Sequence, residues 1–242
     1  MRVLRVVPRS LAPLLLAVAV ATLAALMARR ALRSPVAPPH FGLLAQAMLH
    51  GRLYLDAPVY DGTVFHGRTY IALGLMPAIL MIPAVAAAGP QVPVIWLGVV
   101  SLLAAGPGFW VLWRRLGIAG TADRSWLTLA ALTGTAVLAS VVTSSGYYVA
   151  HLLVIACLVW ALNLALAGRL PFLCGLLVGV AALTRNNAIL AGLAVGGIYW
   201  ERGHRLRDLL AIAAPGAVAA GILLAYNAVR FGSPFFSGYE LQ

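Results

Sequence analysis

The sequence predicts an all-α membrane protein, a polytopic transmembrane helical bundle of about seven spans with a large first external loop. Apolar residues make up 62% of the 242 positions and charged residues only 10%, and the mean hydropathy is +0.96. A soluble domain carries about 45–50% apolar and about 25% charged residues, so this composition excludes an ordinary cytosolic protein. Several apolar runs also have the length of about 20 residues that a membrane span requires.

The charge is strongly positive. All 17 basic residues are arginines, against six acidic residues, which gives a formal net charge of +11. The arginines cluster beside apolar runs, where they orient helices and meet anionic lipid, so we predict membrane lipids as partners and no nucleic acid. Cys157 and Cys174 lie inside apolar runs and form no disulfide or zinc pattern.

Residues 1–30 are predicted to form an N-terminal signal anchor. Arg2, Arg5 and Arg9 precede an apolar run over 11–28, which ends at a pair of arginines. A cleaved signal peptide has a shorter apolar core of about 7–15 residues, so we expect this helix to be retained as a span.

Residues 31–91 are predicted to form the external loop. Most of the chemically reactive side chains gather there, namely His40, His50, Arg52, Asp56, Asp61, His66 and Arg68. The last part of the loop, 71–89, is apolar but contains Pro77 and Pro83, and each proline removes a helical hydrogen bond. We therefore expect a broken helix in or near the membrane interface at 71–89, and not a span.

Residues 92–242 are predicted to form the transmembrane bundle. Clear apolar runs cover 92–113, 126–142, 148–168 and 209–227. Tryptophans at the ends of several runs lie beside arginines, as in the aromatic belt of a membrane interface.

The region 171–200 differs, because two apolar stretches of 13 residues flank the polar sequence Thr184-Arg185-Asn186-Asn187. Thirteen helical residues reach only about 20 Å, which is too short to cross a membrane. Each stretch carries a GxxxG pattern, which permits close helix packing. We expect a tight helical pair whose polar turn opens into a water-filled cavity.

The arginine distribution bears on topology. If 71–89 does not span, an inside N-terminus places ten arginines inside and seven outside; if it spans, an outside N-terminus places twelve inside and five outside. We prefer the first arrangement because it keeps the basic N-terminus inside and accounts for the two prolines, although it leaves Arg29, Arg30 and Arg33 outside.

Short motifs occur in order along nearly the whole chain. The loop carries HFGLLAQAMLHGRLYL at 40–55, YDG at 60–62, GRTY at 67–70 and GLMPAILMIP at 74–83. The bundle adds RRLG at 114–117, GVAALTR at 179–185, YNAVRFGSP at 226–234 and SGY at 237–239. Together they resemble the bacterial GT-C glycosyltransferases, membrane enzymes related to protein O-mannosyltransferases and lipid A aminoarabinose transferases.

This resemblance implies sugar transfer from a polyprenyl-phosphate-linked donor at the outer face of a bacterial inner (plasma) membrane. It also implies juxtamembrane helices and a catalytic carboxylate in the first external loop. Relatives usually have an acidic residue shortly after the first span, whereas here Ala-Pro-Pro-His precedes Phe41 and Gln46 stands where relatives often have Asp. Relatives also generally continue through more spans, so we expect a fragment, a degenerate copy, or half of a split enzyme completed by a second chain.

Glycosyl transfer from a lipid phosphate needs a base for the acceptor and positive charge for the departing phosphate. Asp61 and Asp56 are the predicted catalytic residues, because only they supply a carboxylate in the first loop. Both also suit turns, Asp61 before a glycine and Asp56 before Ala-Pro.

Arg185 is predicted to bind the donor phosphate, with Asn186 and Arg230 as further ligands. An arginine at the centre of a membrane helix costs about 2.5–3.5 kcal/mol on insertion scales, so it faces protein or water and has a partner. Alternatively, Arg185 is the polar tip of a helical hairpin, and Arg230 anchors the last span to lipid headgroups.

Tyr147, Tyr148 and His151 are predicted to line the cavity or bind the acceptor, and the alternative is an interfacial aromatic belt with a histidine at a helix start. Because some relatives use a divalent metal ion, a metal bound by His50, Asp56, Asp61 and His66 stays an alternative. No ligand spacing here matches a zinc or calcium pattern, so we predict against it. Two other functions stay open. One is a non-catalytic membrane subunit or lipid-binding protein of the same fold; the other, with less support, is a transporter.

Overall fold

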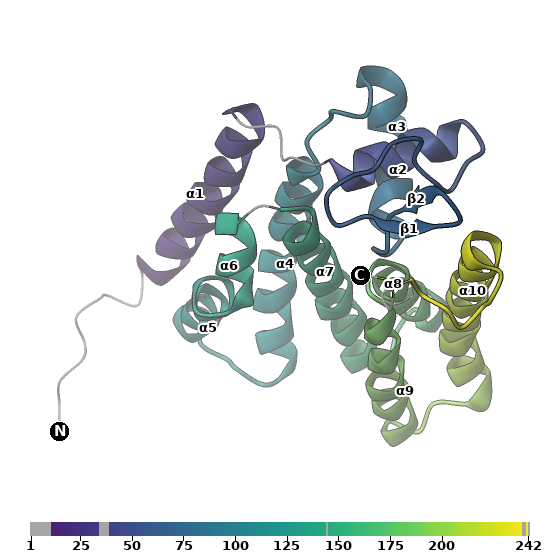
Figure 1. Ribbon diagram of the computed structural model, residues 1–242. Helices are drawn as coiled ribbons and strands as arrows, with labels where there is room; N and C mark the ends of the chain where they lie inside the picture. The colour runs from purple at the N-terminus through teal and green to yellow at the C-terminus, as the bar shows by residue number, and fades with distance from the viewer. Residues whose placement is uncertain (1–10, 34–38, 144, 239–240, 242) are drawn as a thin grey trace.

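The computed structural model describes residues 11–33, 39–143, 145–238 and 241 (Figure 1). The described chain is mainly helical. The α-helices are α1 (Ala12–Arg33), α2 (His40–Leu49), α3 (Met76–Ala88), α4 (Ile95–Arg115), α5 (Thr121–Thr133), α6 (Ala136–Thr143), α7 (Gly146–Ala167), α8 (Pro171–Thr184), α9 (Ala191–Glu201) and α10 (Leu206–Phe231). A 3₁₀ helix, η2 (Asn186–Leu190), and two strands, β1 (Thr63–Phe65) and β2 (Arg68–Tyr70), complete it. The arginines at 2, 5 and 9, and Tyr239 of the SGY motif, lie outside the described residues.

Four helices are long and apolar enough to cross a membrane: Ala12–Arg30 within α1, then α4, α7 and α10. They coincide with four of the predicted runs, and they support a helical membrane protein. About seven spans are not confirmed, because the other apolar runs of the described chain lie in shorter helices, from eight residues in α6 to 14 in α8. Helices of these lengths reach about 12–21 Å, short of a hydrocarbon core of about 30 Å.

The predicted helix over 126–142 is wrong, because the chain breaks into α5 and α6 around Gly134 and Thr135. The hydroxyl of Thr135 donates to the carbonyl of Ala131 at 2.6 Å and accepts the backbone N–H of Val137 at 3.2 Å. A threonine that bonds to nearby backbone in this way competes with the helical hydrogen bonds and favours a new helix start.

The segment 71–89 also differs from the predicted broken helix. Residues 71–75 precede α3, and Pro77 falls in its first turn, where a missing N–H removes no helical hydrogen bond. Pro83 is accommodated inside the helix. The 13 residues of α3 extend only about 20 Å, which agrees with a segment too short to span.

The loop also contains a β-hairpin, β1 paired with β2, which the sequence did not predict. Its two-residue turn, His66-Gly67, has positive φ at both positions (48° and 73°), as a type I′ turn requires. Phe65 packs edge-on against Phe231 at the end of α10, with ring centroids 5.5 Å apart, and Thr63 donates to the carbonyl of Gly238 at 3.2 Å. The hairpin is therefore fastened to the C-terminal end of the chain.

The first half of 171–200, α8, was predicted to pack most tightly against the second half, and it packs most tightly against α10 instead. A Cβ on Gly175 would collide with the carbonyl oxygen of Ile212, and one on Gly179 would lie 3.2 Å from that of Pro215. Both carbonyls belong to α10, so the first GxxxG brings α8 against α10. In the second GxxxG, a Cβ on Gly192 would make an ordinary contact of 3.6 Å with Val178 of α8, and one on Gly196 would meet nothing within 4 Å of the described structure. The two halves therefore do touch, but the close backbone approach is between α8 and α10.

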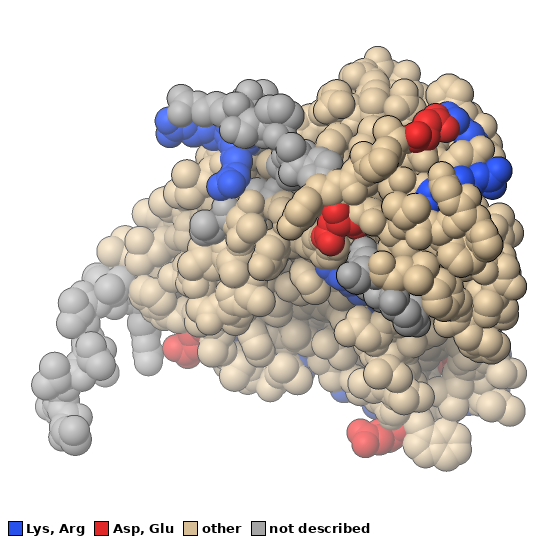
Figure 2. Space-filling model, in the orientation of Figure 1, with Lys and Arg blue, Asp and Glu red and all other residues tan. Residues whose placement is uncertain are grey.

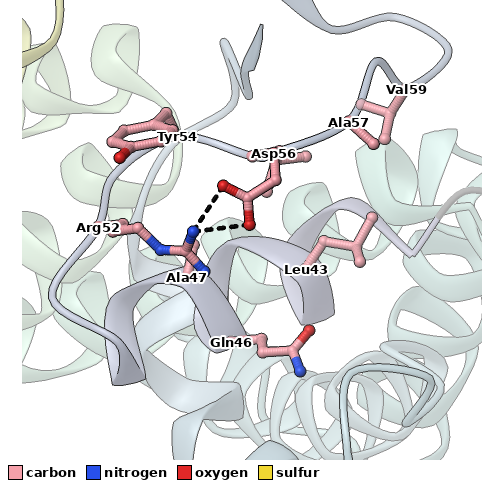
Figure 3. Close-up of a pocket in the computed structure, with 9 residues that line it drawn as sticks. Leu43, Gln46, Ala47, Arg52, Tyr54, Asp56, Ala57 and Val59 are labelled. Atoms are coloured by element: carbon pink, nitrogen blue, oxygen red, sulfur yellow. Dashed lines mark hydrogen bonds and ion pairs between the residues drawn. The ribbon is translucent and has the colours of Figure 1, made fainter. Parts of the chain in front are cut away.

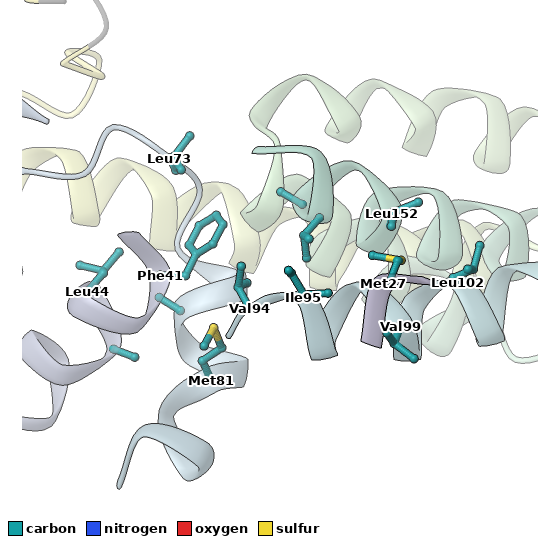
Figure 4. Close-up of a cluster of buried hydrophobic side chains, with 14 of the residues drawn as sticks. Met27, Phe41, Leu44, Leu73, Met81, Val94, Ile95, Val99, Leu102 and Leu152 are labelled. Carbon is teal, nitrogen blue, oxygen red and sulfur yellow. The ribbon is translucent and has the colours of Figure 1, made fainter. Parts of the chain in front are cut away.

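The main core joins the loop to the bundle. Ile95 and Leu102 of α4 are fully buried beside Met27 of α1, and the same cluster continues to Phe41 and Leu44 of α2 (Figure 4). Because α2 packs on α3 as well, the loop is held at the ends of α4 and α7. That packing positions the loop carboxylates.

Candidate functional site

Three distant parts of the chain meet at Tyr147, the second residue of α7. Its hydroxyl donates to Oδ2 of Asp61 in the loop at 2.6 Å. Its carbonyl oxygen accepts from Nη2 of Arg185 at 3.2 Å, and the guanidinium carbon lies 5.4 Å from its ring centroid. A loop carboxylate and the arginine beyond α8 therefore contact the same residue.

Arg185 reaches Tyr147 because of a difference in helix length. The 14 residues of α8 rise about 21 Å and the 22 residues of α7 about 33 Å, so α8 ends short of the Tyr147 end of α7. At Arg185 the backbone turns extended (φ −144°, ψ 114°), and the side chain covers the remaining distance. Its Nε is buried and has no hydrogen-bond partner among the described residues.

A cavity of about 290 Å³ lies beside this arginine, lined by Gly74, Thr184, Arg185, Asn186 and Asn187. Gly74 is required there, because a Cβ would collide with the carbonyl oxygens of Leu183 and Thr184. The cavity therefore presents one guanidinium and two asparagine side chains, all hydrogen-bond donors suited to an anion such as a phosphate.

Asp61 lies in the predicted turn, where Gly62 N–H donates to the carbonyl of Val59 at 3.1 Å. Its φ is +63°, a conformation that aspartate tolerates better than most residues. The residue is exposed, so its carboxylate is open to an aqueous ligand. Charges are sparse on the face in Figure 2, where an acidic patch near the centre lies directly above a basic one.

Asp56 is in a different place. Its two carboxylate oxygens accept from Nη1 of Arg52 at 2.5 and 2.6 Å (Figure 3). The pair lines a separate cavity of about 200 Å³ with Gln46 and Tyr54. The side chain of Asp56 is 66% exposed, so this ion pair contributes little to stability.

Arg230 does not line the Arg185 cavity. It is buried, and it donates from Nη1 to the carbonyl of Ile71 at 2.9 Å and from Nη2 to Oδ1 of Asn227 at 2.9 Å. The guanidinium carbon also lies 3.7 Å from the ring centroid of Tyr226. These contacts fasten the segment before α3 to α10, which is a structural task that the sequence analysis did not anticipate.

Tyr148 and His151 are exposed on α7 near Tyr147. The ring centroids of Tyr148 and His151 lie 6.4 Å apart. Neither lines the Arg185 cavity. Within the described residues, no group of three or more His, Cys, Asp or Glu side chains could hold a metal ion.

Gly74, which forms a wall of the cavity, was not predicted from the sequence. Its signal was a lone glycine directly before an apolar helix, a position where close backbone approach is common. From the sequence, Tyr147 was one of three equivalent residues, and nothing in the local pattern distinguishes the tyrosine that faces Asp61.

The fold and the site together define a helical membrane protein with a carboxylate and a guanidinium gathered where membrane helices end. Comparison of the chain with known family patterns, curated proteins and solved structures finds no match.

Proposed function

We propose that the chain is a GT-C-like membrane glycosyltransferase, or part of one, acting at the outer face of a bacterial plasma membrane. It transfers a sugar from a polyprenyl-phosphate-linked donor to an acceptor. The observation that carries this proposal is the convergence of Asp61 and Arg185 on Tyr147. A base and a phosphate-binding cation must lie this close for one substrate to contact both.

The roles follow from the chemistry of the groups. Arg185, with Asn186 and Asn187, holds the donor phosphate and stabilises the charge that develops on it. The acceptor oxygen or nitrogen attacks the anomeric carbon, whose bond to the phosphate oxygen breaks, and polyprenyl phosphate leaves with the electron pair. Asp61 accepts the proton of the acceptor, and the Tyr147 hydroxyl holds its carboxylate in position.

Asp61 is preferred to Asp56 as the base because Asp56 is paired with Arg52 beside another cavity. Arg185 is preferred to Arg230 as the phosphate ligand because the guanidinium of Arg230 is buried on protein carbonyls and aromatic rings. Arg230 then serves to hold the segment that carries Gly74.

A non-catalytic, lipid-binding subunit is the second candidate. It is favoured by Gln46, which stands beside the Arg52–Asp56 pair where relatives often have an acid. Such a subunit would bind the donor through the Arg185 cavity without transferring the sugar.

The test uses the purified chain in nanodiscs with undecaprenyl phosphate as the binding probe and a set of polyprenyl-phosphate sugars as donors. Arg185→Ala should weaken binding by about 10–100-fold, the value of a hydrogen bond to a charged group. Asp61→Asn should retain binding and lower transfer by about 10²–10⁴-fold, the usual contribution of a general base.

Arg202→Ala, at an exposed position just after α9, is the matched control and should leave binding and transfer unchanged. Equal binding by Arg185→Ala and the unmutated protein would contradict the phosphate site. Donor binding without transfer in the unmutated protein would favour the subunit.

A further inference from the structure

An apolar groove of about 470 Å³ runs between α1 and α4, away from the Arg185 cavity. Leu16 and Val20 of α1 line it, with Leu103, Gly106 and Trp110 of α4. Only 17% of the apolar stretch of α1 is buried inside the molecule. Both helices are long enough to span, so the groove opens towards the membrane interior.

We propose that this groove binds an anionic phospholipid, with an acyl chain between α1 and α4 and the phosphate near Arg124. Trp110 lines the groove, and the guanidinium carbon of Arg124 lies 4.1 Å from the centroid of its ring. The first turn of α5 therefore places a cation at the end of the groove where α4 finishes.

Arg124 has the properties of an incomplete anion site. It is only 8% exposed, and its Nη2 donates to the hydroxyl of Thr121 at 3.2 Å. Its Nε is buried without a hydrogen-bond partner in the described part of the chain, and so is Nε1 of Trp113 in the last turns of α4. A buried donor without an acceptor is costly, and a lipid phosphate beside Arg124 supplies an acceptor oxygen for its Nε.

The surrounding charge selects the headgroup. Arg114 and Arg115 end α4 beside this position, and Asp123 is the one acidic residue in the first turn of α5. The net positive charge attracts a headgroup that carries only negative charge. A transmembrane helix of a second copy would fill the groove equally well, but its apolar side chains would offer no acceptor to Arg124.

The experiment is native mass spectrometry of the detergent-solubilised chain, titrated with phosphatidylglycerol and phosphatidylcholine of identical acyl chains. The unmutated protein should retain phosphatidylglycerol preferentially. Arg124→Gln should lower that retention by about tenfold, the effect of losing one charge-assisted contact. Arg169→Gln, at the exposed end of α7, is the matched control and should behave as the unmutated protein does.

A second variant tests the acyl-chain groove itself. A Cβ at Gly106 would make only ordinary contacts, 3.7 Å to Val20 and 3.9 Å to Leu132, so Gly106→Leu should fold and fill the groove. It should lower phosphatidylglycerol retention, whereas Gly216→Leu on α10, where nothing lies within 4 Å, should not.

Equal retention of the two lipids by the unmutated protein, or unchanged retention in Arg124→Gln, would overturn the proposal. So would a two-chain mass that disappears with Gly106→Leu, because the occupant would then be a second copy. None of these readouts depends on Arg185 or on sugar transfer, so the proposed function stands or falls separately.

Discussion

Tyr147 acts through three different parts of one residue. Its hydroxyl holds Asp61, its carbonyl accepts from Arg185, and its ring lies beside the guanidinium. Only the contact with Asp61 needs the phenol oxygen. A phenylalanine at this position therefore removes the contact with the carboxylate and keeps both contacts with Arg185.

Tyr147→Phe should lower the sugar-transfer rate by about tenfold or more while undecaprenyl phosphate binding stays within about twofold, since only the position of the base is disturbed. Tyr148→Phe, on the neighbouring exposed ring, is the control and should change neither quantity. A Tyr147→Phe variant that loses binding and keeps its transfer rate would refute this division of roles.

Gly74 lies so close to the end of α8 that a single methyl group disturbs the site. Gly74→Ala should lower the free energy of unfolding by about 1–3 kcal/mol, because the new Cβ would overlap backbone oxygens that cannot rotate away. Denaturant unfolding in detergent measures the change.

Gly216→Ala is the comparison, because its Cβ would enter open space within a helix. It should leave stability unchanged or raise it by about 0.5–1 kcal/mol, the difference between Ala and Gly in a helix interior. Equal losses in the two variants would show that the close approach at Gly74 has no energetic importance.

At the scale of elements, the two GxxxG patterns look equivalent in sequence but have different environments. A Cβ added to Gly175 would collide with the backbone of α10, whereas one added to Gly196 would meet nothing within 4 Å in the described structure. Small residues matter in membrane helices only where another backbone approaches them. The pattern therefore predicts that packing is possible, and the neighbouring helix determines whether it occurs.

Gly175→Val should separate α8 from α10 and lower the thermal unfolding midpoint of the detergent-solubilised chain by several degrees, consistent with about 1–3 kcal/mol of overpacking. Gly196→Val should shift the midpoint little. A larger loss at Gly196 would mean that another helix approaches this glycine closely.

At two places, the external loop and the break between α5 and α6, a few side chains determine the secondary structure, and the apolar composition of the segment does not reveal it. Thr135 ends one helix and begins the next through its own hydroxyl. The His66-Gly67 turn folds a hairpin in a loop for which the sequence predicted helices and turns but no strands. Both signals are short side-chain patterns that apolar run length does not reveal.

At the scale of the whole molecule, the predicted topology places the loop outside and the α4–α5 and α9–α10 connections inside. Cysteine labelling in right-side-out vesicles tests this. Tyr60→Cys (82% exposed) should react with a membrane-impermeant maleimide, and Leu206→Cys (67% exposed) should react only after permeabilisation. The native Cys157 and Cys174 are buried and should stay unlabelled.

Labelling of both positions from the outside would contradict the topology. Labelling of Leu206→Cys alone would mean that the whole arrangement is inverted, with the Asp61–Arg185 site facing the cytoplasm. The proposed use of an outer-leaflet donor would then fail.

The sequence by itself indicated a helical membrane protein and the polar interruption at 184–187. Its apolar runs included all four long helices, but it also counted 126–142 as a run of the same kind, which the structure divides. These follow from composition and from apolar run length, which are local properties of the chain. It also singled out Asp61, Asp56 and Arg185, because charged groups are rare in such a chain.

Only the tertiary structure decided that Asp61 and Arg185 contact the same tyrosine while Asp56 pairs with Arg52. It also decided that Arg230 fastens a loop and that α8 packs on α10. Each depends on contacts between residues far apart in the chain, and the packing of neighbouring helices selects one partner among several that are chemically equivalent. Local patterns show which groups need partners, and the three-dimensional packing determines which partners they find.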